Sequence, residues 1–296
     1  MNGFPWSRDA GRYVELGDCK LHVADEGEGP TVLLLHGWGR SYATWNKVGP
    51  ALAKRRRVLA PDMPGLGWST RPDKAAGTYA RHAEFLLRLM DAEGLDRAAM
   101  VGNSFGGAVA LHLALNHPDR VDVLALLAPL GYRTPITRAM RAVGRGRFLG
   151  RFLWSFMTPK RISHRLAGLS SGKGEFPPPT RGELEAELVG LKEYGGGAPG
   201  LRDALVACIE DLAWRVDELE PPTLVICGMD DPLVPAQLGS DLAQGVQEGR
   251  FEGLFHAGHF PHEEQTQQVL DLLTTFLAGR ENRRGPDNFS LVVDGT

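Results

Sequence analysis

A serine between two glycines is the residue of this chain whose type and spacing best fit catalytic chemistry. The pentapeptide Gly-Asn-Ser-Phe-Gly occupies residues 102–106, with Ser104 at its centre. The short apolar run 98–101 precedes it, and residues 107–115 follow with apolar side chains at helical spacing. A serine on a strand-to-helix turn, with a glycine two residues away on each side, is the sequence form of a nucleophile elbow. The glycines are expected because a side chain at either position would collide with the neighbouring strand or helix.

A serine hydroxyl becomes a good nucleophile only when a base takes its proton and a carboxylate orients that base. In open α/β sheets such residues follow the carboxyl ends of strands. Asp230 and Asp231 follow one expected strand, and the segment 256–262, which holds three histidines, follows the next. The order serine, acid, histidine is the one that accompanies a nucleophile elbow. The loop 128–131 contains no carboxylate, which leaves the acid to the segment 228–235.

A third motif predicts donors for a developing oxyanion. His-Gly-Trp-Gly at residues 36–39 follows the apolar run 31–35 directly. With a nucleophile elbow, one N–H of the oxyanion hole comes from this position and the other from the residue after the nucleophile. The expected donors are therefore the backbone N–H groups of Trp38 and Phe105. His36 is expected to tie loops together by hydrogen bonds.

The elements that must position these residues alternate between strand and helix along most of the chain. This alternation predicts an α/β fold with a mostly parallel, doubly wound sheet and helices on both faces. The expected strands are residues 12–16, 20–25, 31–35, 57–60, 98–101, 121–127, 223–227 and 250–255. The expected helices are residues 45–54, 79–93, 107–115 and 263–277.

The alternation is interrupted over residues 131–221. This segment contains helical pieces, a run of three prolines and a run of three glycines, but no clear buried strand. We therefore predict a helical lid at 131–221, inserted into a core made of residues 1–130 and 222–280. Residues 281–296 are expected to form a weakly specified tail.

Composition excludes several other classes of protein. The chain has 296 residues, of which 43% are hydrophobic, enough for one large core and an insertion. A net charge of −3 gives no reason to expect nucleic acid as a partner. The three cysteines form no metal-type spacing, the amino terminus has no apolar signal segment, and no apolar stretch is long enough for a membrane span. We expect a soluble, cytoplasmic protein with a small-molecule partner; the sequence does not set its oligomeric state.

These motifs together resemble the α/β-hydrolase fold superfamily, in its serine-nucleophile branch of lidded esterases, perhydrolases and carbon–carbon bond hydrolases. The resemblance rests on the segments 36–39, 62–69, 102–107, 228–235 and 258–263. It implies that Ser104 is the nucleophile, Asp231 the acid and His259 the base, and it implies no cofactor and no metal. Branches of the fold that form their ester intermediate on an aspartate are disfavoured, because a serine occupies that position here.

Within this branch, we expect hydrolysis of a small, apolar carboxylic ester through an acyl-enzyme intermediate. Two alternatives stay open, a carbon–carbon bond hydrolase acting on a ring-fission diketone and a slow-turnover ligand receptor. The segment 102–107 is similar to the elbow of the carbon–carbon bond hydrolases, which usually have a tryptophan after the catalytic histidine, where this chain has Phe260. Those enzymes also use a lid arginine to hold a substrate carboxylate. The candidates here include Arg133, Arg138, Arg141 and Arg165.

Overall fold

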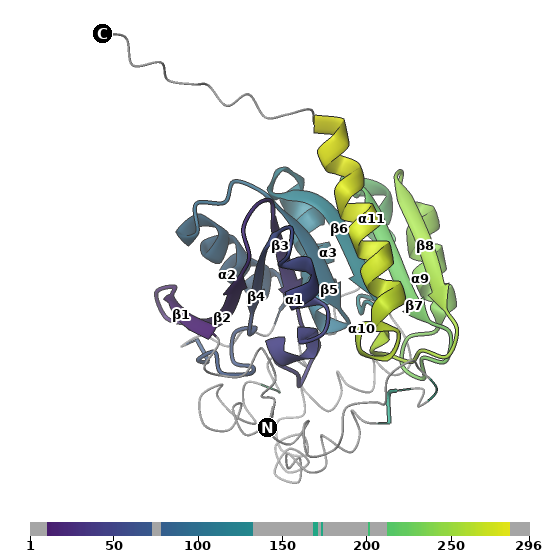
Figure 1. Ribbon diagram of the computed structural model, residues 1–296, viewed down its shortest axis with the longest axis horizontal. Helices are drawn as coiled ribbons and strands as arrows, with labels where there is room; N and C mark the ends of the chain where they lie inside the picture. The colour runs from purple at the N-terminus through teal and green to yellow at the C-terminus, as the bar shows by residue number, and fades with distance from the viewer. Residues whose placement is uncertain are drawn as a thin grey trace.

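An eight-stranded sheet forms the centre of the protein, with strand order β1-β2-β4-β3-β5-β6-β7-β8 (Figure 1). The strands are β1 (Gly11–Glu15), β2 (Lys20–Glu26), β3 (Thr31–Leu35), β4 (Arg57–Pro61), β5 (Ala98–Asn103), β6 (Val121–Leu127), β7 (Thr223–Gly228) and β8 (Gly249–Leu254). The pairs β1–β2 and β2–β4 are antiparallel, and all the others are parallel. The predicted mostly parallel sheet is confirmed.

The structure is a computed structural model, and it describes residues 11–72, 78–132, 168–170, 173, 201 and 212–284. The predicted lid lies outside the described residues except for its two ends and a few positions between them. The part of the predicted tail beyond residue 284 lies outside them as well. Among the described residues, no helix is both long enough and apolar enough to cross a bilayer.

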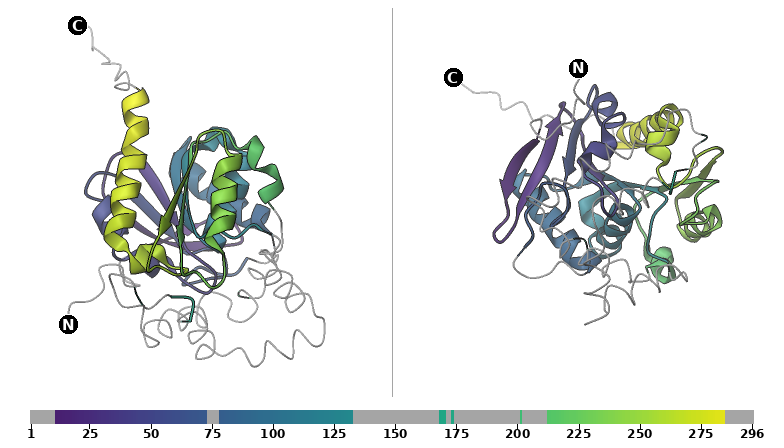
Figure 2. Two further views of the ribbon diagram at one scale, coloured as in Figure 1. Left: turned by 90° about the vertical axis from the view of Figure 1, so that its right-hand side faces the viewer. Right: turned by 90° about the horizontal axis from the view of Figure 1, so that it is seen from below.

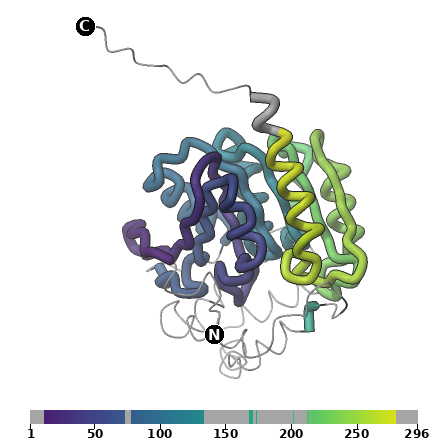
Figure 3. Tube along the Cα trace, in the orientation of Figure 1, coloured from purple at the N-terminus to yellow at the C-terminus, as the bar shows by residue number. Residues whose placement is uncertain are grey.

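Helices cover both faces of the sheet (Figure 2). The helices α2 (Tyr79–Ala92), α3 (Phe105–Asn116) and α9 (Ala236–Gly245) pack on one face, and α1 (Gly49–Leu52) and α11 (Thr266–Arg284) on the other. Other short helical segments are η2 (Tyr42–Trp45), η3 (Pro118–Arg120), η4 (Ala213–Glu218) and α10 (Pro261–Glu264). The amino-terminal strands lie at one side of the sheet and the carboxyl-terminal elements at the other (Figure 3).

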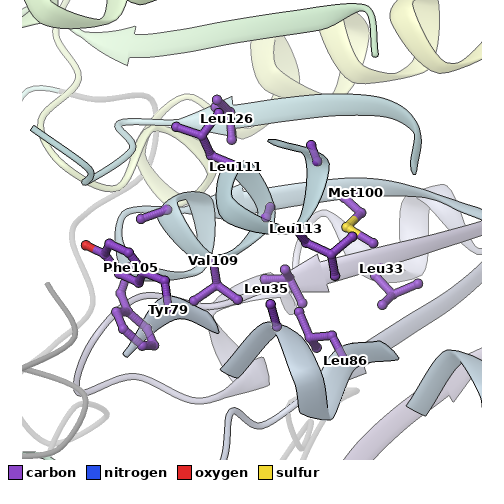
Figure 4. Packing of buried hydrophobic residues seen from close by; sticks show 14 of the residues in the cluster. Leu33, Leu35, Tyr79, Leu86, Met100, Phe105, Val109, Leu111, Leu113 and Leu126 are labelled. Atoms are coloured by element: carbon purple, nitrogen blue, oxygen red, sulfur yellow. The ribbon is translucent and has the colours of Figure 1, made fainter. Parts of the chain in front are cut away.

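Each central strand buries both of its faces. Leu33 and Leu35 of β3 belong to the hydrophobic cluster under α2 and α3, whereas Val32 and Leu34 belong to the cluster under α11. This division follows from the two-residue period of a strand and explains why the run 31–35 is apolar throughout. On the α3 side, the helix inserts its apolar side chains between α2 and the sheet (Figure 4).

Three elements differ from the sequence-based prediction. The expected helix 45–54 is divided: η2 ends at Trp45 and the separate helix α1 begins at Gly49, with Pro50, which lacks the N–H that a continuous helix requires, in its first turn. The expected helix 263–277 is interrupted at Gln265, and α11 then continues to Arg284. Helix α9 was not expected, because two of its ten residues are glycine and its apolar stripe is short.

Candidate active site

Ser104 is the single residue between strand β5 and helix α3. Its φ of 54° and ψ of −113° lie in a region of backbone conformation that residues other than glycine rarely adopt. Two backbone bonds hold this conformation: the Ser104 N–H donates to the Leu127 carbonyl at 2.9 Å, and the Leu130 N–H donates to the Ser104 carbonyl at 3.0 Å. Strand β6 and the loop that follows it thus stabilise a strained turn, which is characteristic of functional sites.

The glycines of the elbow leave room for this turn. A Cβ atom on Gly102 would lie 2.6 Å from the Gly106 carbonyl oxygen, and one on Gly106 would lie 2.3 Å from the Leu35 carbonyl oxygen. Both obstacles are backbone atoms, which cannot rotate away as a side chain can. The collision predicted from the sequence is therefore present at both positions.

Replacing Gly106 with alanine is expected to destabilise the fold by at least about 1–3 kcal/mol, the usual effect of overpacking a well-packed core. Gly279 in α11 provides the matched control, because a Cβ atom there meets nothing within 4 Å. Gly279→Ala is expected to raise stability by up to about 1 kcal/mol through helix propensity. Urea unfolding of the two variants measures both effects, and equal stabilities would contradict the steric account of the elbow.

The structure brings Ser104, His259 and Asp231 into one hydrogen-bonded chain. His259 Nε2 lies 2.7 Å from Ser104 Oγ, and His259 Nδ1 lies 2.7 Å from Asp231 Oδ2. Because a carboxylate only accepts hydrogen bonds, Nδ1 carries the imidazole proton and Nε2 is left to accept from the serine hydroxyl. The chain has the geometry that general-base activation of a serine requires.

The two adjacent aspartates have different surroundings. Asp231 Oδ1 accepts the backbone N–H groups of Leu233 at 2.7 Å and Val234 at 3.0 Å, so its carboxylate is held from both sides. The Asp230 carboxylate is 36% exposed and forms an ion pair with Lys173 at 3.5 Å. The geometry therefore favours Asp231 over Asp230 as the partner of the histidine.

The loop after β3 lies directly against the serine. A Cβ atom built on Gly37 would be 3.5 Å from Ser104 Cβ, and the Arg40 N–H closes the turn by donating to the Gly37 carbonyl at 3.2 Å. Trp38 lies within this turn, and its indole Nε1–H donates to the Leu201 carbonyl at 2.8 Å. Phe105 is the first residue of α3, where backbone N–H groups have no partner within the helix. Both expected oxyanion donors thus belong to segments that adjoin Ser104.

Sequence reasoning missed the groups that fix the histidine loop. The His259 N–H donates to the Leu169 carbonyl at 2.8 Å, and Asn103 Nδ2 donates to the His259 carbonyl at 3.1 Å. The buried Glu264 carboxylate accepts the N–H groups of Gly258 at 3.1 Å and Phe260 at 3.3 Å. Asn103 and Glu264 stand close in sequence to the predicted nucleophile and base, but nothing in a single sequence separates them from ordinary polar neighbours.

The prediction for His36 is confirmed. Its Nε2 accepts the Met63 N–H at 2.9 Å, so that the imidazole joins the loop after β3 to the loop after β4. In the second loop, Asp62 accepts the N–H groups of Tyr42 at 2.7 Å and Trp68 at 2.9 Å. Burial lowers the pKa of His36, which keeps the imidazole neutral. Within the described part of the chain, no group of three or more histidine, cysteine or acidic residues has an arrangement that holds a metal ion.

A second buried histidine makes stability depend on pH. His262 is fully buried beside Trp45, with ring centroids 4.3 Å apart, and burial lowers its pKa to about 3. The unfolded chain binds a proton there below a pH of about 6.5, whereas the folded protein does not. Folding stability is therefore fully present above that pH and is lost as the pH falls from about 6.5 towards about 3.

The variant His262→Gln is expected to show a shallower decline of the unfolding free energy between pH 6.5 and pH 4.5. The histidine contributes about 1.4 kcal/mol per pH unit to this decline, the value for one proton. Urea titrations of both proteins at several pH values measure the two slopes, so a lower stability of the variant at neutral pH does not affect the comparison. Identical slopes would contradict the assignment.

The sequence pattern of the family described as the alpha/beta hydrolase fold matches residues 30–152. The chain is 30% identical to the 2-hydroxymuconate semialdehyde hydrolase of a Pseudomonas species over 292 residues, which cover 94% of this chain and 97% of that protein. It is 27% identical to the 2-hydroxy-6-oxo-6-phenylhexa-2,4-dienoate hydrolase of Burkholderia cepacia, over 89% of this chain and 93% of that protein.

Solved structures agree with this similarity. A meta-cleavage product hydrolase from Pseudomonas fluorescens superposes with a TM-score of 0.73 and 25% sequence identity, covering 92% of this chain and 98% of that one. The similarity therefore extends over the whole architecture described above. The candidate lid arginines Arg133, Arg138, Arg141 and Arg165 lie outside the described residues.

Proposed function

The chain belongs to the α/β-hydrolase superfamily, and from that membership we propose that it is a serine hydrolase that cleaves a carbon–carbon bond beside a ketone or aldehyde carbonyl. The substrate class is a ring-fission product of the 2-hydroxy-6-oxo-dienoate type. The observation that carries this choice is the similarity, over nearly the full length of both chains, to hydrolases named for such compounds. It favours the carbon–carbon bond over the carboxylic ester that we expected from the sequence.

Cleavage of a 2-hydroxy-6-oxo-dienoate begins with a proton transfer within the substrate. Moving the enol proton to C5 gives a 2,6-dioxo compound in which C5 is saturated and adjoins the C6 carbonyl. A nucleophile adds to C6, and the C5–C6 bond then breaks. Its electron pair moves through the remaining double bond onto the C2 oxygen, which makes the leaving fragment a stabilised dienolate. One water is consumed overall, and the products are a carboxylic acid and a 2-hydroxydienoate.

The side chains of the candidate site can perform the steps that follow the transfer of the enol proton to C5. Ser104 Oγ adds to C6 while His259 Nε2 takes its proton, and Asp231 stabilises the resulting imidazolium. The N–H groups of Trp38 and Phe105 stabilise the oxyanion at C6; removing one such donor typically lowers the rate by about 10²–10³. His259 returns its proton to the leaving dienolate, and water then releases the acyl group from Ser104 by the same route.

A small-molecule ester remains the second candidate. The observation that favours it is Phe260, because the carbon–carbon bond hydrolases that this chain resembles usually have tryptophan there. Phe260 is buried, and its ring lies edge-on to His259 with centroids 5.4 Å apart. An ester needs the same three side chains and the same oxyanion donors, but it needs no electron sink in its leaving group.

Product analysis separates these candidates. The purified protein is incubated with 2-hydroxy-6-oxo-6-phenylhexa-2,4-dienoate, and the products are quantified by chromatography. We expect benzoate and 2-hydroxypenta-2,4-dienoate in equal amounts. If the dienoate is left intact by a preparation that hydrolyses p-nitrophenyl esters over many turnovers, the carbon–carbon assignment is wrong and the ester assignment replaces it. A preparation that stays acylated without turnover supports a receptor.

A further inference from the structure

A buried ion pair connects the two loops that carry different parts of the candidate site. Arg40 follows the predicted oxyanion turn, and Glu263 belongs to α10, directly after the histidine loop. The guanidinium faces the carboxylate with two nitrogens, at 2.7 Å and 3.3 Å. Arg40 is 2% exposed and Glu263 is 8% exposed, although the two residues are 223 positions apart in sequence.

Further contacts fix the carboxylate of Glu263. The Thr44 hydroxyl donates to it, and the same hydroxyl oxygen lies 2.9 Å from His262 Nε2. Because the hydroxyl proton is engaged with the carboxylate, His262 Nε2 must be the donor in the second bond. Burial acts to raise the pKa of Glu263, but the adjacent Arg40 holds it below its usual value, so the carboxylate is charged.

Such a pair is a weak source of stability. Removing two charges from water opposes folding, and a buried ion pair replaced by apolar residues of similar volume often leaves stability unchanged or higher. What the pair supplies is a two-point, directional connection, because a bidentate guanidinium–carboxylate contact fixes both distance and orientation. We therefore expect the pair to fix the relative position of the two loops rather than to add stability.

The pair contacts both catalytic segments. Arg40 closes the turn that contains Trp38 through its N–H bond to Gly37. The Arg40 guanidinium also lies over the Phe260 ring, 5.0 Å from its centroid, and that ring adjoins His259. A displacement of Arg40 therefore moves the predicted oxyanion donor on one side and the support of the imidazole on the other.

We propose that Arg40 and Glu263 are a positioning pair, which sets the placement of the Trp38 N–H and the His259 imidazole relative to each other around Ser104. The pair touches no reacting atom and acts through the two loops that it joins. This inference rests on the proposed roles of Ser104, His259 and Trp38, but not on the choice between a carbon–carbon bond and an ester. A misplacement of about 1 Å in such a site can lower the rate about 10²-fold.

The test compares Arg40→Met, Glu263→Met and the double variant with the wild type. One readout is the rate at which a fluorophosphonate probe labels Ser104, which needs the nucleophile, base and oxyanion donors but no particular substrate. The others are kcat and KM for p-nitrophenyl acetate and the 6-phenyl dienoate. We expect labelling and kcat to fall about 10–100-fold, with KM changed less than about threefold. The double variant, which removes both charges of this pair, should regain the melting temperature but not the rate.

An ion pair outside the site is the control. Arg12 and Glu93 form an ion pair at 2.7 Å between β1 and the end of α2, and replacing both with methionine should leave the labelling rate unchanged. A folded Arg40→Met/Glu263→Met protein with the wild-type labelling rate and kcat would overturn the proposal. If that variant does not fold, Arg40→Lys decides, because it keeps the charge but loses the two-point contact: a wild-type labelling rate then overturns the proposal, and a reduced one supports it. Failure of the proposed serine-hydrolase chemistry is distinguished, because wild-type Ser104 would then not be labelled at all, whereas an ester hydrolase would still be labelled.

Discussion

Replacing Ser104 with alanine is expected to lower kcat by about 10⁴–10⁶-fold, the range found when the nucleophile of a serine–histidine–aspartate triad is removed. The reason is that no other group in the described site stands 2.7 Å from His259 Nε2 with a hydroxyl to deprotonate. The fold should not change, because alanine at this position removes one oxygen and leaves the backbone bonds to Leu127 and Leu130 in place.

Steady-state kinetics with the 6-phenyl dienoate measure the effect, and circular dichroism and the melting temperature verify the fold. Ser240→Ala in α9 is the matched control, since it makes the same chemical change outside the site, and it should retain full activity. A folded Ser104→Ala protein that keeps wild-type turnover would show that the nucleophile is misassigned.

Asp231→Asn is expected to lower kcat by about 10⁴-fold with the structure retained. An asparagine oxygen can still accept the Leu233 and Val234 N–H groups, so the loop keeps its conformation. The amide can then present its NH₂ to His259, which favours the tautomer with the proton on Nε2. That imidazole cannot accept the proton of Ser104. The neutral asparagine also lacks the negative charge with which Asp231 stabilises the imidazolium.

The adjacent Asp230→Asn variant provides the comparison. Its side chain is part of an exposed ion pair with Lys173 and is therefore expected to change kcat less than about threefold, since exposed pairs contribute little. The two variants differ by one position in the same loop and carry the same chemical change. Equal losses of activity in both would contradict the assignment of the acid.

The elbow and the strands were predictable because their signals are local. The glycines at 102 and 106 express a steric requirement of one turn, and the structure places backbone atoms within 2.6 Å of both missing Cβ positions. The apolar run of β3 expresses the burial of both of its faces, which only a central strand of a layered sheet experiences. Local patterns of this kind predict the order of serine, acid and histidine, although not the distances between them.

The remainder depends on contacts between distant residues. Asp230 and Asp231 are chemically identical in the sequence, and only the direction of the loop after β7 separates their roles. Arg40 and Glu263 lie 223 residues apart, and neither stands in a pattern that predicts a buried pair. The substrate class likewise does not follow from the three catalytic side chains, because ester and carbon–carbon bond cleavage use them in the same way.

A competition between the two substrate classes in one reaction mixture distinguishes carbon–carbon bond hydrolysis from ester hydrolysis. The purified wild-type protein receives 2-hydroxy-6-oxo-6-phenylhexa-2,4-dienoate and p-nitrophenyl acetate together, and the relative kcat/KM values follow from the rates of disappearance. We expect the dienoate to be preferred by at least about 100-fold, which corresponds to about 2.7 kcal/mol of transition-state stabilisation. Any preference for the ester, however small, would contradict the assignment of the protein as a carbon–carbon bond hydrolase.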